Sequence, residues 1–157
     1  MGGKRVGGGR VGRALALMAF DVVKGEAANI DPSATLYVAG SVRRGLEVVG
    51  DLDVVVAAGD LEAACLLLEQ LPGIMEVDTH QIQVDYIPAW PESLGAALMH
   101  STGPVGLNIV QRRAAKAEGL KLNQYGLFRN GVRIAGRSEW QIYQKLGLTW
   151  KEPQCRE

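Results

Sequence analysis

The feature that most constrains this chain is a pair of aspartates at the start of an apolar strand. Asp51 and Asp53 are separated by one leucine and lead into three consecutive valines. Because side chains alternate between the two faces of an extended strand, both carboxylates point the same way. Two like charges this close repel each other unless a cation is present, and hard divalent ions such as Mg2+ favour oxygen ligands. The doublet therefore predicts a metal site at one end of a buried strand.

A glycine-rich, basic segment precedes the acidic doublet. It runs from Gly40 through Ser41, Arg43 and Arg44 to Gly45. A Gly-Ser turn can offer backbone N–H groups and a hydroxyl to a phosphate, and arginine stays charged at any working pH. Phosphate-binding and metal-binding groups are thus expected within one short stretch of the chain.

The zero net charge of the 157-residue chain hides a division along its length. Residues 1–30 sum to +3, residues 31–92 to −9 and residues 93–157 to +6. An acidic block between basic ones suits a protein that gathers metal ions centrally and holds a polyanion around them. Solvated faces of mixed sign give such an asymmetry about as often.

The compartment is indicated by what the sequence lacks. Its two cysteines, Cys65 and Cys155, give neither a disulfide framework nor a zinc-type spacing. No apolar run approaches the roughly 18 residues needed to cross a membrane, and no signal-peptide pattern opens the chain. We expect a cytoplasmic protein with no membrane partner, or a nuclear one if the source is a eukaryote or a nuclear-replicating virus.

The first residues are rich in glycine and basic side chains, including Lys4, Arg5 and Arg10. Residues 7–12 formally match GxGxxG, but no strand precedes them and no βαβ unit follows, so a dinucleotide site is not expected. An arm that contacts nucleic-acid phosphates and a partly disordered tail are the two remaining interpretations.

Apolar periodicity and turn residues predict an α+β chain. Helices are expected over residues 13–24, 60–70, 93–100 and 104–118 and after Ser138, and strands over residues 35–39, 51–57, 74–79 and 81–87. The Thr79-His80 step should reverse the chain, and Asn130-Gly131 predicts a β-hairpin. Asp85 lies on the polar face of its strand, and a sheet with the right strand order would bring it beside the acidic doublet.

The helix over residues 104–118 carries a basic stripe. Its charged members are Arg112, Arg113 and Lys116, and its expected packing residues are Leu107, Val110 and Ala114. A boundary between two lobes is expected near Glu92, within a segment punctuated by prolines.

Six motifs, in their order along the chain, resemble those of the family X DNA polymerases. They are GSVRRG at 40–45, GDLDVVV at 50–56, QVDYI at 83–87, STGP at 101–104, GLKLNQYGLF at 119–128 and SEWQIYQKLGL at 138–148. The first two alone would indicate only the wider nucleotidyltransferase superfamily, and GLKLNQYGLF narrows the resemblance. It implies a basic arm and first palm helix over 1–30, a catalytic palm with a mixed sheet over 31–92, and a small α/β thumb with a β-hairpin over 93–157.

The resemblance assigns roles to palm residues. Asp51, Asp53 and Asp85 fall on the metal-binding carboxylates, which would hold two Mg2+ ions about 4 Å apart, with Mn2+ as a substitute. Asp85 would help to deprotonate the primer 3′-hydroxyl. Gly40, Ser41 and Arg44 match the contacts to the nucleoside triphosphate, and Arg43 is expected just behind them.

In the thumb, Asn108 matches the position that hydrogen-bonds the base of the incoming nucleotide, and Arg112 the position that reaches the template strand. The resemblance also implies that the segment facing the nucleotide comprises His100, Ser101, Thr102 and Gly103. Many members have an aromatic pair where this chain has His100-Ser101, so selection against ribonucleotides is in question. His100 is either a contact to the sugar or an ordinary surface histidine.

Three hypotheses follow. The first is a template-directed, gap-filling DNA polymerase that acts as a monomer on gapped primer–template DNA and nucleoside triphosphates, without a lyase domain, because too few residues precede the palm. The second is a template-independent or ribonucleotide-tolerant nucleotidyltransferase. The third is a non-catalytic nucleic-acid-binding module, which would not need three mutually repelling acids.

Overall fold

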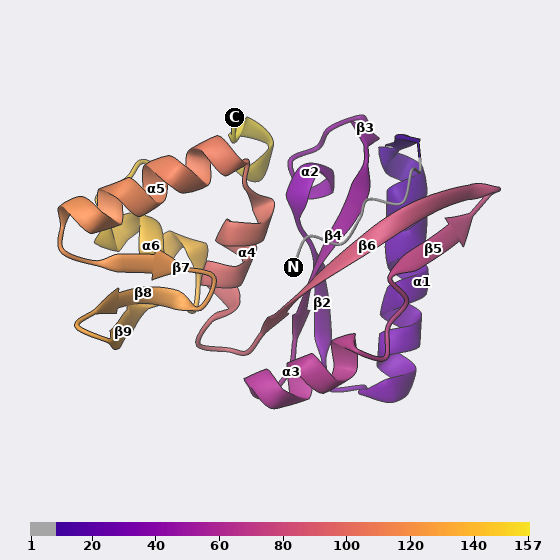
Figure 1. Cartoon of the computed structure of the whole chain (residues 1–157), viewed down its shortest axis with the longest axis horizontal. Helices are drawn as coiled ribbons and strands as arrows, with labels where there is room; N and C mark the ends of the chain where they lie inside the picture. Colours follow the sequence, from indigo (N-terminus) through magenta and orange to yellow (C-terminus); the bar gives the residue numbers. More distant parts are fainter. Residues whose placement is uncertain (1–8) are drawn as a thin grey trace.

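A computed structural model describes residues 9–157, so Lys4 and Arg5 lie outside the described residues. Figure 1 shows two lobes, one built from the indigo and magenta first half of the chain and the other from the orange and yellow second half. Helix α4 (Leu94–Thr102) lies between them and contacts both. The chain has the mixed α+β fold that its sequence predicts.

The first lobe is organised around a four-stranded sheet in the order β2-β4-β6-β5. These strands are β2 (Thr35–Val38), β4 (Asp51–Ala57), β6 (His80–Ala89) and β5 (Ile74–Val77). Strands β4 and β6 run parallel, whereas β2 and β5 pair antiparallel with their neighbours, so the sheet is mixed. The parallel pair lies at its centre, where both faces can be covered.

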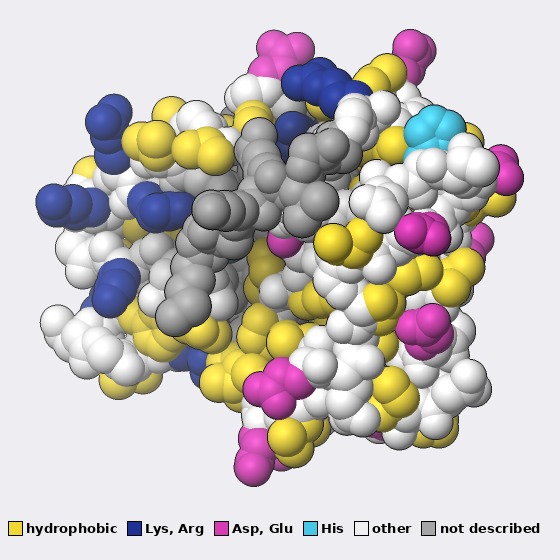
Figure 2. Space-filling model, turned by 45° about the vertical axis from the view of Figure 1, so that its right-hand side comes forward, with side chains coloured by type: hydrophobic (Ala, Val, Ile, Leu, Met, Phe, Trp, Pro, Cys, Tyr) yellow, Lys and Arg dark blue, Asp and Glu magenta, His cyan; other side chains and the backbone are white. Residues whose placement is uncertain are grey.

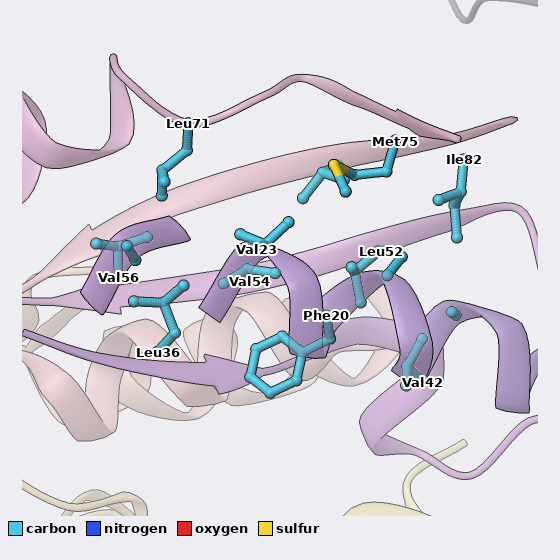
Figure 3. Packing of buried hydrophobic residues seen from close by; sticks show 14 of the residues in the cluster. Phe20, Val23, Leu36, Val42, Leu52, Val54, Val56, Leu71, Met75 and Ile82 are labelled. Atoms are coloured by element: carbon cyan, nitrogen blue, oxygen red, sulfur yellow. The ribbon is translucent and has the colours of Figure 1, made fainter. Parts of the chain in front are cut away.

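One face of this sheet packs on helices α1 (Arg13–Ile30) and α3 (Leu61–Leu68). Figure 3 shows Leu52, Val54 and Val56 of β4 directed into this core together with Phe20 and Val23 of α1. The intervening β4 residues therefore point to the opposite face, where Val55 packs against Ala97 of α4. The alternation read from the sequence is confirmed.

Some elements of the first lobe differ from the sequence-based expectation. Helix α1 continues to Ile30 instead of ending at residue 24, because Ala27 is buried and extends the packed stripe past Gly25. The glycine-rich segment forms a short helix, α2 (Gly40–Arg43), rather than a simple turn. Strands β1 (Val11–Gly12) and β3 (Val48–Val49) form a small additional sheet.

The reversal between β5 and β6 lies one residue earlier than expected. Val77 pairs with His80, and the two residues between them, Asp78 and Thr79, have φ of 51° and 68°. Aspartate tolerates this left-handed conformation better than most residues, which places the turn at Asp78-Thr79.

The second lobe combines helices with a three-stranded antiparallel sheet, β7-β8-β9. Its elements after α4 are α5 (Val105–Ala117), β7 (Lys121–Asn123), β8 (Gly126–Arg129), β9 (Val132–Ala135), α6 (Glu139–Lys145) and a 3-10 turn, η1 (Pro153–Cys155). Asn130 and Gly131 turn the predicted hairpin with φ of 50° and 78°. Strand β7, which had not been predicted, extends that hairpin.

Helix α5 is rotated relative to the prediction. Val110 is exposed, and the buried positions are Asn108, Gln111 and Ala115. The two amides can be buried because each donates a hydrogen bond: Asn108 Nδ2 to the His100 carbonyl and Gln111 Nε2 to the Tyr143 hydroxyl. A search for an apolar stripe could not detect packing of this kind. Within residues 9–157, no helix has the length and apolar character required of a membrane span.

Candidate active site

The three predicted carboxylates lie on neighbouring strands and on one face of the sheet. Asp53 of β4 is the register partner of Asp85 of β6, and Asp51 is the partner of Gln83. Register partners in a parallel pair point to the same side, so the acids share the face that carries Val55 farther along β4. Two charged groups from β4 and one from β6 thus come together at one end of the sheet.

Electrostatics confirm that the three acids interact. The pKa of Asp53 is raised from its ordinary value of 3.8 to about 7 by burial first, and then by the negative charges of Asp51 and Asp85. The positive charge of Arg44 opposes this rise. A carboxylate in such surroundings is costly to ionise unless a cation is bound nearby.

No group of three or more His, Cys, Asp or Glu side chains in the described part of the chain is gathered closely enough to form a metal cage as it stands. Asp85 Oδ1 accepts a hydrogen bond from Gln83 Nε2 at 2.9 Å. The donor set nevertheless fits a hard divalent cation, because three carboxylates share one face and Asp53 is held from ionising largely by burial and by its acidic neighbours.

Helix α2 is held directly against this acidic end of the sheet. Gly40 has φ of 58°, and a Cβ at this position would overlap the carboxyl group of Asp53. Only glycine therefore fits, for its conformation and for its lack of a side chain. The close approach places Ser41 and Arg44, the predicted triphosphate contacts, beside the acids.

Arg44 also connects the first lobe to the end of α4. Its Nη1 donates to the Thr102 carbonyl at 2.6 Å, and Thr102 is fully buried. The same Nη1 atom lies 3.5 Å from the point where a Cβ would stand if Gly103 carried a side chain. The predicted Thr102-Gly103 segment is therefore brought next to the basic end of α2.

Two of the predicted nucleotide contacts and the predicted template contact line a small pocket in the second lobe. His100, Asn108 and Arg112 contribute to it, with Gln111 and Asn123. Burial first, and then the charge of Arg112, lower the pKa of His100, which favours the neutral imidazole. Ser101 directly follows His100 in the last turn of α4, and its Oγ donates to the Ala97 carbonyl at 2.6 Å.

The predicted nucleic-acid contacts are exposed. Arg112, Arg113 and Lys116 project from α5, and Arg10 is exposed at the start of the described chain. Figure 2 shows several Lys and Arg side chains over the lobe that contains α5, and Asp and Glu side chains over the lobe that contains the β4 sheet. The charge division of the sequence is thus a division between two lobes.

Comparison with known proteins gives this arrangement its family. Residues 10–86 match the DNA polymerase beta palm, and residues 97–157 match the DNA polymerase beta thumb. A repair DNA polymerase X of African swine fever virus is 30% identical over 146 residues, which cover 79% of this chain and 82% of the viral protein. The chain belongs to the family X DNA polymerases. The predicted enzyme class, a DNA-directed DNA polymerase of the repair type, is confirmed, and the non-catalytic alternative has no support.

Longer proteins match in part. The DNA polymerase/3′-5′ exonuclease PolX of Bacillus subtilis is 31% identical over 134 residues, 76% of this chain but only 24% of the bacterial protein. DNA polymerase IV of Saccharomyces cerevisiae is 40% identical over 67 residues, 43% of this chain and 11% of the yeast protein. DNA and a nucleotide are the substrates of a family X polymerase, and a divalent metal is its general requirement.

Two residues of the polymerase were not singled out from the sequence. Glu139 and Arg156 are buried and form an ion pair with each other. Glu139 also forms an ion pair with Arg43. The available signal was weak: Glu139 follows the predicted cap Ser138, which accepts a hydrogen bond from the Gln141 backbone N–H. An acid in a first helical turn is normally read as a surface residue that favours the helix dipole.

We predict that the metal-free polymerase loses stability as the pH rises from about 4 to about 7. The folded protein keeps a proton on Asp53 up to a pKa of about 7, whereas the unfolded chain releases it near 3.8. The contribution of Asp53 to stability is therefore greatest below this window and falls by at most about 1.4 kcal/mol for each pH unit within it. Urea unfolding in the presence of a chelator, followed across this window, measures the effect.

Asp53→Asn should abolish most of this pH dependence, and Asp21→Asn, on the exposed side of α1, should not. An unchanged pH dependence in Asp53→Asn would show that another group is responsible.

Proposed function

We propose that this polymerase fills gaps in duplex DNA, with Asp51, Asp53 and Asp85 as the carboxylates that hold its divalent metal ions. The observation that carries the proposal is the placement of these three acids on one face of adjacent strands, directly beside α2. Mg2+ is the proposed ion and Mn2+ a substitute, because both accept oxygen ligands. Bound there, such ions would supply charge stabilisation to the reacting phosphate and its attacking and leaving oxygens.

The chain's own groups divide the remaining work. Ser41 offers a hydroxyl and Arg44 a permanent positive charge, which suit them to bind and orient a triphosphate. Asp85 is suited to accept the proton of the primer 3′-hydroxyl, because the Gln83 amide donates to its carboxylate and, among the described residues, no arginine does.

The second lobe would hold the nascent base pair. Asn108 donates one amide N–H to the His100 carbonyl, and its second N–H and its oxygen would be the groups that hydrogen-bond a base. Arg112 lines the same pocket from the exposed side of α5, followed by Arg113 and Lys116. A basic helix next to that pocket suits contact with the template backbone.

Four further features belong to the proposal. The palm and thumb meet near Glu92, just beyond β6 and before α4. The polymerase acts as a monomer, and its place of action is the cytoplasm, or the nucleus in a host that has one. Lys4, Arg5 and Arg10 contact phosphates of the DNA outside the gap.

Asp85→Asn should reduce primer extension on gapped DNA by about 100-fold or more, because the group that accepts the hydroxyl proton is lost while the side-chain shape is kept. Single-turnover extension with Mg2+ measures this. Asp21→Asn, the same change on the exposed side of α1, should leave the rate unaltered. Extension by Asp85→Asn at the normal rate would refute the role given to Asp85.

Deleting residues 1–8 should weaken DNA binding and lower its dependence on salt. Lys4 and Arg5 would be lost, and each phosphate contact contributes about 0.9 to the slope of log K against log salt. The deletion stops before Val11, which is buried and pairs with Val49. Fluorescence titrations of gapped DNA at several salt concentrations test this, with Lys24→Gln on α1 as the control. An unchanged slope would exclude the arm from the interface.

His100 and Ser101 favour tolerance of ribonucleotides as a second property of the site. Ser101 is small and its hydroxyl is directed to the Ala97 carbonyl, and the imidazole of His100 is smaller than the ring of a Tyr or Phe, so neither position presents a bulky ring to the sugar. Ser101→Phe should therefore raise the preference for dNTP over rNTP, by roughly tenfold if a steric clash of 1–2 kcal/mol is introduced. Single-nucleotide incorporation opposite each template base measures the preference. A wild-type enzyme that already rejects ribonucleotides strongly would disprove the idea.

A further inference from the structure

The two lobes are joined by an ion pair behind the proposed triphosphate site. Arg43 of α2 donates from Nη1 and Nη2 to the two carboxylate oxygens of Glu139, the first residue of α6, at 2.9 and 2.7 Å. The partners are 96 residues apart in the sequence. Because the contact is bidentate, it fixes the orientation of the guanidinium as well as its distance.

A second arginine holds Glu139 from the other side. Arg156, in the tail that follows α6, donates from Nη1 to Glu139 Oε1 at 2.7 Å. Its side chain is 1% exposed, donates from Nε to the Lys151 carbonyl, and lies over the rings of Tyr143 and Trp150. The tail is therefore fastened to the thumb on one side of Glu139, with the palm on the other.

The group formed by Arg43, Glu139 and Arg156 differs from an incidental surface ion pair, because burying charged side chains costs free energy. Burial would raise the pKa of Glu139, but the hydrogen bonds and charges of Arg43 and Arg156 outweigh burial and lower it. Glu139 is thus ionised between two cations. Within the described residues, Nη2 of Arg156 finds no hydrogen-bond partner. Removal of one member of such a buried group leaves an uncompensated charge, which is strongly unfavourable.

The ion pair with Glu139 also restricts the position of the residues next to Arg43 on α2. Its Nη1 also donates to Thr102 Oγ1 at 2.7 Å, and Arg44 donates to the carbonyl of the same threonine. Arg43, Arg44 and Ser41 belong to one short helix and its cap, so they cannot move independently. The C-terminal tail also lies close to the end of α2, since Gln154 Cγ is 3.5 Å from the point where a Cβ would stand on Gly45.

We propose that Glu139, held in place by Arg156 of the C-terminal tail, is a positioning residue for nucleotide binding. It fixes α2 against the thumb and thereby sets where Ser41 and Arg44 meet the triphosphate. The inference rests on the proposed function of Ser41 and Arg44. It adds that the tail, far from these residues in sequence, controls the affinity for the nucleotide.

Glu139→Gln should raise the KM for dNTP roughly tenfold on gapped DNA, because small displacements of binding groups have large effects. The Kd for DNA should stay within about twofold, since the basic face of α5 is untouched. Glu92→Gln is the matched control: its ion pair with Arg137 joins exposed side chains, 43% and 66% accessible, so its KM should not change.

Arg156→Met tests the tail separately, since methionine keeps the packing on Tyr143 and Trp150. It should raise the KM for dNTP in the same direction, and the double variant should match Glu139→Gln alone if Arg156 acts through Glu139. A merely structural role would instead lower the active fraction and kcat, and would leave KM unchanged.

The outcomes separate the two levels of proposal. If neither variant changes the KM for dNTP by more than about twofold while wild type extends primers, the positioning role is wrong and the polymerase assignment is untouched. If Ser41→Ala and Arg44→Met leave the KM for dNTP unchanged, the proposed triphosphate site is itself wrong. If Glu139→Gln fails to fold, Arg156→Met decides the matter.

Discussion

The repulsion among Asp51, Asp53 and Asp85 is the constraint on which the rest of the structure depends. Three acids on one face of two adjacent strands would destabilise a sheet that had no other support. Strand β4 tolerates them because its opposite face, with Leu52, Val54 and Val56, is fully buried beneath α1. The apolar face anchors the strand, and the acidic face is left available for chemistry.

Two consecutive arginines at the end of α2 lie at different distances from these acids, Arg44 nearer and Arg43 farther. Arg44 is close enough to lower the pKa of Asp53, yet its guanidinium is held by the Thr102 carbonyl and the cluster remains underneutralised. Arg43 is directed away from the acids and is used between the lobes. Consecutive arginines on one short helix therefore lie in different surroundings, Arg44 beside the acids and Arg43 at the lobe interface.

Local patterns in the sequence were sufficient for β4, for the hairpin at Asn130 and for the family motifs, because alternation and turn chemistry act over a few residues. They could not show that Asp85 pairs with Asp53, since parallel register depends on the whole sheet. The face of α5 was misjudged because Asn108 and Gln111 are buried through hydrogen bonds. The pairing of Arg43 with Glu139 joins residues from different lobes, and neither has a local signature.

The acidic cluster on β4 and β6 and the cluster of Arg43, Glu139 and Arg156 each carry a net charge in the protein alone, and the two charges have opposite signs. The acids of β4 and β6 carry excess negative charge, which adds to burial in raising the pKa of Asp53. The group formed by Arg43, Glu139 and Arg156 carries two positive charges against one negative charge. In the proposed site, a metal–triphosphate complex would bring cations to the first cluster and an anion next to the second. A substrate bound as proposed would therefore complement the charge of both lobes together, and its binding would favour the arrangement in which α2 is held between them.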